Sequence, residues 1–153
     1  MNTTNTDTTL QSIHADPSCA ARFASARLSG DALQCDAKDA AAPASYTLQV
    51  TPAGWRIALS TPDRWLSESI ESQLVESRES LEELFEEELK DLDWPGTPPA
   101  VRHFRDESKH YVFECTLPRM PDTAAEFGRV RTHWLAFEST FRQLGDMAGS
   151  DSH

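Results

Sequence analysis

The strongest structural constraint in this sequence is a stripe of large apolar side chains near its C-terminal end. They recur at alternating intervals of three and four residues, the repeat of one helix face: Phe127, Val130, Trp134, Phe137, Phe141 and Leu144. Asp122 follows two prolines and is a capping type, so the pattern predicts a helix from about Thr123 to Met147. Such a helix needs a second layer to bury its aromatic face. Because the stripe is as narrow as a helix seam, an alternative is that part of it mediates dimerisation.

Alternating apolar and polar residues predict that this second layer is a sheet. Residues 46–50 and 55–59 each alternate as half-buried strands do. Thr51-Pro52-Ala53-Gly54 lies between them and has turn residues at the positions that a tight turn favours. These two segments therefore predict an antiparallel hairpin.

A second predicted hairpin joins residues 101–105 to residues 110–117 through a charged turn. If Arg105 pairs with His110, Phe104 lies opposite Tyr111. One face of this hairpin then carries four side chains that the core would bury: Tyr111, Phe113, Cys115 and Leu117. The other face carries His103, His110, Val112 and Glu114.

The N-terminal part of the chain gives weaker signals. Residues 23–38 alternate around Ser29-Gly30-Asp31, which predicts a third hairpin. Residues 1–20 contain few apolar side chains and predict a mobile arm. The alternative is a short amphipathic helix around Leu10 to Ala21, which Pro17 would have to interrupt or end. The expected organisation is this arm, a single domain over residues 21–148, and a disordered tail over residues 149–153.

Most of the negative charge lies in one predicted helix. Thr61-Pro62-Asp63 is typical of a helix start, and the helix continues to about Leu92 with a bend or a break into two helices at Ser77. Residues 64–93 hold eleven acids and three bases, a net charge of −8 in a chain of net charge −11. These elements together predict a two-layer α+β sandwich, in which two or three hairpins pack against a long acidic helix and a long aromatic helix.

Charge and motif content exclude several classes of function. The acidic balance argues against nucleic acid and membranes as partners, because both require a basic footprint. The six glycines do not cluster into a phosphate-binding loop, a dinucleotide fingerprint or a nucleophile elbow. Neither a membrane-spanning run nor a signal peptide is present, which predicts a cytoplasmic protein. We expect no cofactor and no enzymatic activity.

One rival hypothesis is a small metal-dependent enzyme. The predicted pairing brings His103, His110 and Glu114 to one sheet face, and two histidines with a carboxylate can bind zinc. A nucleophilic Cys115 beside one of these histidines is a related alternative. The three cysteines are widely spaced and odd in number, so they predict neither a metal knuckle nor a disulfide framework.

The order of elements resembles the secretion-chaperone-like superfamily, which includes type III secretion chaperones and YbjN-like proteins. The resemblance covers about residues 46–147, and it includes the passage from residues 111–118 into the helix that carries Trp134, Phe137 and Phe141. It implies a non-enzymatic protein-binding module, commonly dimeric, that holds an extended partner segment against strands or apolar patches.

The sequence therefore predicts a protein-binding module of chaperone or adaptor type that holds a partner segment on its sheet. The expected contact residues are of two kinds, apolar residues of the sheet and acids of the helix: Trp55, Ile57, Leu59, Tyr111, Phe113, Glu82, Glu83, Glu86 and Glu87. The alternative is a charge mimic that binds a basic protein through residues 64–93. The expected partner is thus another protein, either basic or with an extended apolar segment, or a second copy of the chain.

Overall fold

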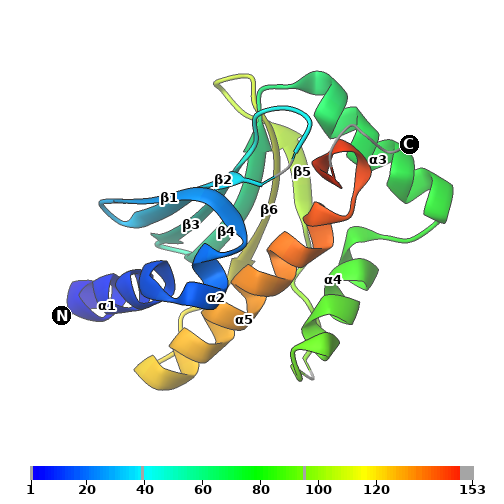
Figure 1. Cartoon of the computed structure of the whole chain (residues 1–153). Helices are drawn as coiled ribbons and strands as arrows, with labels where there is room; N and C mark the ends of the chain where they lie inside the picture. Colours follow the sequence, from blue (N-terminus) through cyan, green and yellow to red (C-terminus); the bar gives the residue numbers. More distant parts are fainter. Residues whose placement is uncertain (1, 39, 95, 149–153) are drawn as a thin grey trace.

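The computed structural model describes residues 2–38, 40–94 and 96–148, built around a six-stranded antiparallel sheet in the order β1-β2-β3-β4-β6-β5 (Figure 1). The strands are β1 (Phe23–Ser29), β2 (Ala32–Ala37), β3 (Ser45–Thr51), β4 (Gly54–Thr61), β5 (Arg102–Arg105) and β6 (Tyr111–Leu117). The helices are α1 (Asn2–Ala15), α2 (Pro17–Ala20), α3 (Arg64–Ser77), α4 (Leu81–Asp91), α5 (Thr123–Arg142) and the 3-10 turn η1 (Gly145–Ala148). The predicted α+β sandwich is confirmed.

Three hairpins supply the six strands, as the sequence predicts. The turn between β3 and β4 leaves Thr51 paired with Gly54. Gly54 has a φ of 134°, and a Cβ atom at this position would lie 2.1 Å from the carbonyl oxygen of Leu117. Only glycine allows β4 to begin this close to the end of β6.

The two faces of the sheet differ in chemistry because side chains alternate along each strand. Figure 1 shows α5 lying across one face of the sheet, with α1 and α4 beside it. That face carries the buried apolar residues of the four central strands: Leu33, Cys35, Tyr46, Leu48, Trp55, Ile57, Leu59, Phe113, Cys115 and Leu117. The opposite face carries polar and small side chains such as Gln34, Thr47 and Arg56.

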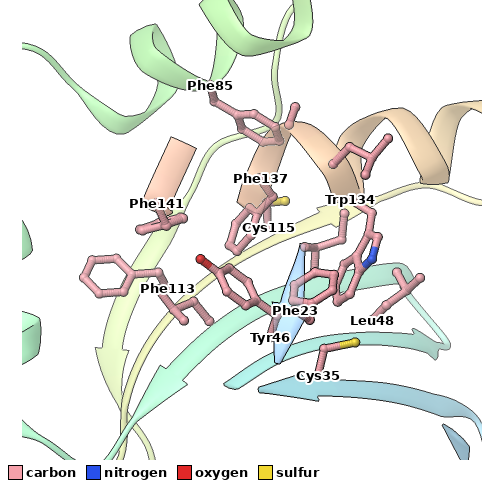
Figure 2. Close-up of a cluster of buried hydrophobic side chains, with 14 of the residues drawn as sticks. Phe23, Cys35, Tyr46, Leu48, Phe85, Phe113, Cys115, Trp134, Phe137 and Phe141 are labelled. Atoms are coloured by element: carbon pink, nitrogen blue, oxygen red, sulfur yellow. The ribbon is translucent and has the colours of Figure 1, made fainter. Parts of the chain in front are cut away.

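Helix α5 lies at the centre of the helical layer. Its predicted stripe faces the sheet, where Phe137 and Phe141 pack against Tyr46 and Phe113 (Figure 2). The helix is also buried on its other sides, because α4 packs along it and α1 contacts it. The side chains of His133, Leu135 and Glu138 are consequently buried as well. The stripe is therefore core from Val130 to Leu144, while Phe127 at its start is partly buried.

The acidic segment forms two helices, and the first ends at Ser77, where the sequence predicts a bend or a break. Arg78 ends α3 in the left-handed conformation, with a φ of 61°. Ser80 then caps α4 through a capping box, in which its hydroxyl accepts from the Glu83 N–H and the Glu83 carboxylate accepts from the Ser80 N–H. The two helices therefore point in different directions (Figure 1).

The N-terminal region differs from the mobile arm that composition predicts. Residues 2–15 form α1, and Leu10 and Ile13 are buried in the main hydrophobic core. Asp16 caps α2 and forms an ion pair with Arg131 of α5, with 2.7 Å between Oδ2 and Nε. Two apolar residues three positions apart are enough to anchor α1, because α5 and the first hairpin supply an apolar surface on which they pack. The tail at residues 149–153 lies outside the described residues.

The register of the last hairpin differs by one residue from the predicted one. Arg105 pairs with Tyr111, Phe104 with Val112 and His103 with Phe113. The cause is a longer loop, in which the Asp106 carboxylate accepts from the N–H groups of Ser108 and His110 and Lys109 adopts a φ of 67°. A one-residue shift moves side chains to the other face. His103 therefore faces the helices, and the predicted pairing of Phe104 with Tyr111 is wrong.

His133 joins α4 and the following loop to α5. Its ring packs edge-on against Phe85 and Trp94, with centroids 5.9 and 5.3 Å away. Its Nδ1–H donates to the Arg129 carbonyl oxygen at 2.7 Å. Burial lowers the pKa of His133, so the neutral ring is the form that the fold stabilises.

This environment predicts that acid destabilises the protein through His133. A folded-state pKa below the unfolded value gives stability that is present above about pH 6.5, the unfolded pKa, and that is lost as pH falls. We expect the free energy of unfolding, measured by urea titration between pH 7.5 and 5, to fall less steeply in His133→Gln than in the wild type. The difference between the two profiles isolates His133 from other titrating groups, and parallel profiles would contradict the assignment.

Candidate functional site

Helix α3 is capped at both of its ends. The Asp63 carboxylate accepts from the Leu66 N–H at 2.9 Å, and the Arg78 N–H donates to the Leu74 carbonyl at the other end. Leu66, Ser67 and Ile70 are buried against the sheet and η1. The inward positions are thus filled by residues three and four apart, which fixes the side of the helix that faces outward.

The outward side of α3 combines acids with two strongly exposed apolar side chains. We call it the α3 outer face, and it consists of Trp65, Glu68, Glu71, Ser72, Val75 and Glu76. Trp65 is 70% exposed and Val75 is 78% exposed. Five of these residues line an open groove of about 550 Å³, from Glu68 to Glu76. Trp65 lies about one turn before Glu68, on the same side of the helix.

The charges of this face have few local partners. Arg64 forms an ion pair with Glu68, with 2.9 Å between Nε and Oε2, and its guanidinium lies 5.8 Å from the Trp65 ring centroid. Glu71 lies 3.6 Å from Nδ1 of His103, which is stacked on Phe113 at a centroid distance of 3.9 Å. Burial lowers the pKa of His103, and Glu71 offsets part of this effect. The face therefore keeps a net negative charge at neutral pH.

The four predicted contact acids of α4 have different roles. Glu83 belongs to the capping box, and the carboxylate of Glu82 accepts from the Val101 N–H at 2.8 Å. Glu86 lies 3.9 Å from Lys90, while Glu87 is exposed. Glu82 and Glu83 therefore stabilise the start of α4 and the chain leading into β5, and reversing their charges would disturb the fold itself.

The predicted contact residues of the sheet lie in the core. Trp55, Ile57, Leu59 and Phe113 are almost completely buried beneath the helices. They cannot contact a partner in this structure, because α5 and α3 already cover this face. Tyr111 is half-buried at the start of β6, with the Arg105 guanidinium 5.6 Å from its ring centroid.

The proposed metal ligands do not come together. His103 faces the helices, whereas Glu114 lies on the opposite face between Arg56 and Arg102, with the Arg102 Nη1 2.8 Å from Oε2. His110 lies in the loop before β6. Within the described ranges, no group of three or more metal-binding side chains is assembled.

Cys115 is placed unfavourably for nucleophilic chemistry. It is buried beneath α5, and burial raises the pKa of its thiol to about 12. The thiolate, which is the reactive form, is therefore scarce at neutral pH. Cys19 and Cys35 are likewise free and buried, with pKa values raised to about 11 and about 12 by burial.

Sequence reasoning missed the two residues that mark the α3 outer face. Trp65 directly precedes Leu66, and Val75 directly follows Leu74, so each falls outside the inward stripe by one position. An apolar residue out of phase with a helix stripe is the signal that would have found them.

Comparison with known proteins gives no further guide to function. Searches against protein-family models, curated proteins and solved structures found no match. Among the described helices, none has the length and apolar character that crossing a bilayer requires. The resemblance to the secretion-chaperone-like superfamily stays a prediction, and function has to be argued from the geometry of this chain.

Proposed function

We propose that this protein is a non-enzymatic protein-binding module of chaperone or adaptor type, and that it binds a basic partner segment with apolar side chains on the α3 outer face. The observation that carries the proposal is the exposure of Trp65 and Val75 on one side of a single helix. Only four large apolar residues in the described ranges are strongly exposed, and these two far exceed Leu28 at 39% and Leu92 at 37%.

The spacing of these two residues fits a partner of modest length. They are ten residues apart, which is about 15 Å along the axis at the standard rise per residue. Exposed tryptophan is a residue type that contributes strongly to protein interfaces. A partner with two apolar side chains at this spacing would cover both at once and exclude water between them.

Charge complementarity indicates which charged side chains the partner should carry. Glu68, Glu71 and Glu76 lie between and beside the two apolar side chains. Lysine or arginine side chains of a partner would meet these acids, and an arginine could also stack on Trp65 as Arg64 does. A basic, amphipathic segment therefore fits this face better than an acidic or a purely apolar one.

The first test is the binding of a defined peptide. We would titrate a fluorescein-labelled helical peptide, with leucines on one face and lysines on the other, and measure anisotropy. Trp65→Ala and Val75→Ala should each weaken binding by about tenfold or more. Leu28→Ala is the matched control because it removes an exposed apolar side chain from β1, and it should bind as the wild type does. Equal affinities for all four proteins would refute the proposal.

A second pair of variants separates α3 from the rest of the acidic segment. Glu76→Lys and Glu87→Lys make the same change of charge at exposed positions of α3 and α4. Glu76→Lys should weaken peptide binding and reduce its salt dependence, while Glu87→Lys should do so much less. If Glu87→Lys had the larger effect, the binding face would be α4 and not the α3 outer face.

The free edge of β1 supports a second candidate, in which a partner strand extends the sheet. The sheet order leaves β1 and β5 at the edges, but β5 has only four residues and an arginine at each end. β1 has seven residues, most of them exposed. Its two-residue turn makes Ser29 and Ala32 the closing hydrogen-bonded pair, so the Leu28 N–H points toward the free edge. Leu28→Pro should then abolish binding of an extended peptide that Leu28→Ala retains.

A further inference from the structure

A pocket of about 580 Å³ lies between α2, the end of β2, α5 and η1. Its lining combines three basic side chains with one carboxylate and several small or apolar groups: Ser18, Ala21, Arg22, Lys38, Glu138, Arg142 and Met147. The volume is in the range of pockets that hold small molecules. None of these residues belongs to the α3 outer face.

Two guanidinium groups converge on one dipeptide of α5. Arg22 Nη1 lies 3.0 Å from one oxygen of the Glu138 carboxylate, and Arg142 Nε lies 3.4 Å from the other. The Ser139 hydroxyl oxygen accepts from both arginines. Arg22 also donates to the Leu135 carbonyl at 3.2 Å. These contacts fix both guanidinium groups at the pocket wall.

The charges of the pocket are not balanced. Among the lining residues that the structure describes, Arg22, Lys38 and Arg142 face a single carboxylate, which leaves two positive charges in excess. Lys38 Nζ donates to the Ala21 carbonyl at 3.3 Å, and this acceptor carries no formal charge. This excess is notable in a chain whose net charge is −11.

Glu138 holds the two arginines from a buried position. Its side chain is only 5% exposed. Burial raises the pKa of Glu138, and Arg142 and Arg22 offset only part of this effect. A buried ion cluster contributes little net stability, because removing charges from water costs about as much as their attraction returns. The arrangement is better explained by the two guanidinium groups that it positions at the pocket wall.

We propose that this pocket binds the phosphoryl group of a small phosphorylated molecule between Arg22, Lys38 and Arg142. A phosphate monoester carries about −1.5 to −2 charges at neutral pH, which matches the excess of two positive charges. Planar guanidinium groups bind phosphate through paired donors, and a lysine adds a point charge. Ala21 and Met147 provide an apolar wall for the organic part of the ligand.

Calorimetry with inorganic phosphate on the full chain tests this assignment. We expect saturable binding at constant ionic strength, maintained with chloride, and weaker binding of acetate. Arg142→Gln and Lys38→Gln should each weaken phosphate binding by about tenfold or more, because each removes a charged donor. Both positions are exposed, so the variants should fold, and circular dichroism checks that they do.

Arg27→Gln is the matched control. The Arg27 side chain is 53% exposed against 55% for Arg142, and it also forms an ion pair with an acid, Asp36. It should bind phosphate as the wild type does. The assignment is overturned if phosphate shows no saturation, if acetate binds as tightly, or if Arg27→Gln loses as much affinity as Arg142→Gln. Peptide binding by the α3 outer face is measured separately, so either result leaves the other proposal open.

Discussion

Replacing Phe137 by alanine is expected to lower the free energy of unfolding by about 3–5 kcal/mol, as aromatic truncations in protein cores do. Phe137 is fully buried, and its ring contacts three others, those of Tyr46, Phe85 and Phe141, at centroid distances of 6.2, 5.9 and 4.8 Å. It thus joins the sheet to α5 and α5 to α4. The alanine would leave a cavity surrounded by rings from three different elements. These rings cannot move into the cavity unless whole elements move.

Urea unfolding followed by far-ultraviolet circular dichroism measures this loss. Phe127→Ala is the matched control, since Phe127 belongs to the same stripe of α5 but is only partly buried. It should cost clearly less than Phe137→Ala. If the two variants lost the same amount of stability, Phe137 would not be the contact that unites the three elements.

Replacing Glu126 by alanine should lower the free energy of unfolding by about 3 kcal/mol, the lower end of the range for breaking a buried ion pair. The Glu126 carboxylate accepts two hydrogen bonds from Arg119, at 2.9 and 3.2 Å, and one from the Met120 N–H at 2.8 Å. Burial alone would raise the pKa of Glu126, yet Arg119 and the Met120 N–H hold it below its ordinary value. The carboxylate therefore ties the loop after β6 to the first turn of α5.

The pH dependence gives a second readout of the same contact. A lowered folded-state pKa means that the stability is present above the unfolded pKa of about 4.3 and is lost as pH falls through the folded value. Glu126→Ala should therefore differ from the wild type at pH 7 and approach it in strong acid. Glu68→Ala removes an exposed carboxylate from an i,i+4 ion pair and should change stability little. An equal loss in both variants would contradict the role of Glu126.

Local sequence patterns are enough to predict most of the fold. The strand alternation, the turn at Gly54 and the apolar stripe of α5 are each set by neighbouring residues, so the sequence predicts them correctly. For the residues of α1 the sequence favours a mobile arm over a helix, because only Leu10 and Ile13 are apolar and their burial depends on a surface that other elements build. The β5–β6 register was missed because the conformation of one loop residue, Lys109, decides it.

The candidate sites were harder to predict because they depend on distant parts of the chain. The sheet residues proposed to bind a partner, such as Trp55 and Phe113, have the composition of an interface, but α5 covers them in the folded chain. The phosphate pocket brings Arg22 and Glu138 together across 116 residues. No spacing rule in one sequence can place such residues side by side.

The central position of α5 has a consequence for how the chain is made. All six strands precede α5 in the sequence, and Phe137 and Phe141 of that helix pack on the helix-covered face of their sheet. During synthesis the strands leave the ribosome with this apolar face uncovered, and a nascent chain that stops before Phe137 and Phe141 lacks the side chains that close the core. We therefore expect the domain to fold only late in translation. Its unfinished chains should expose apolar surface that the general chaperones of the cell bind.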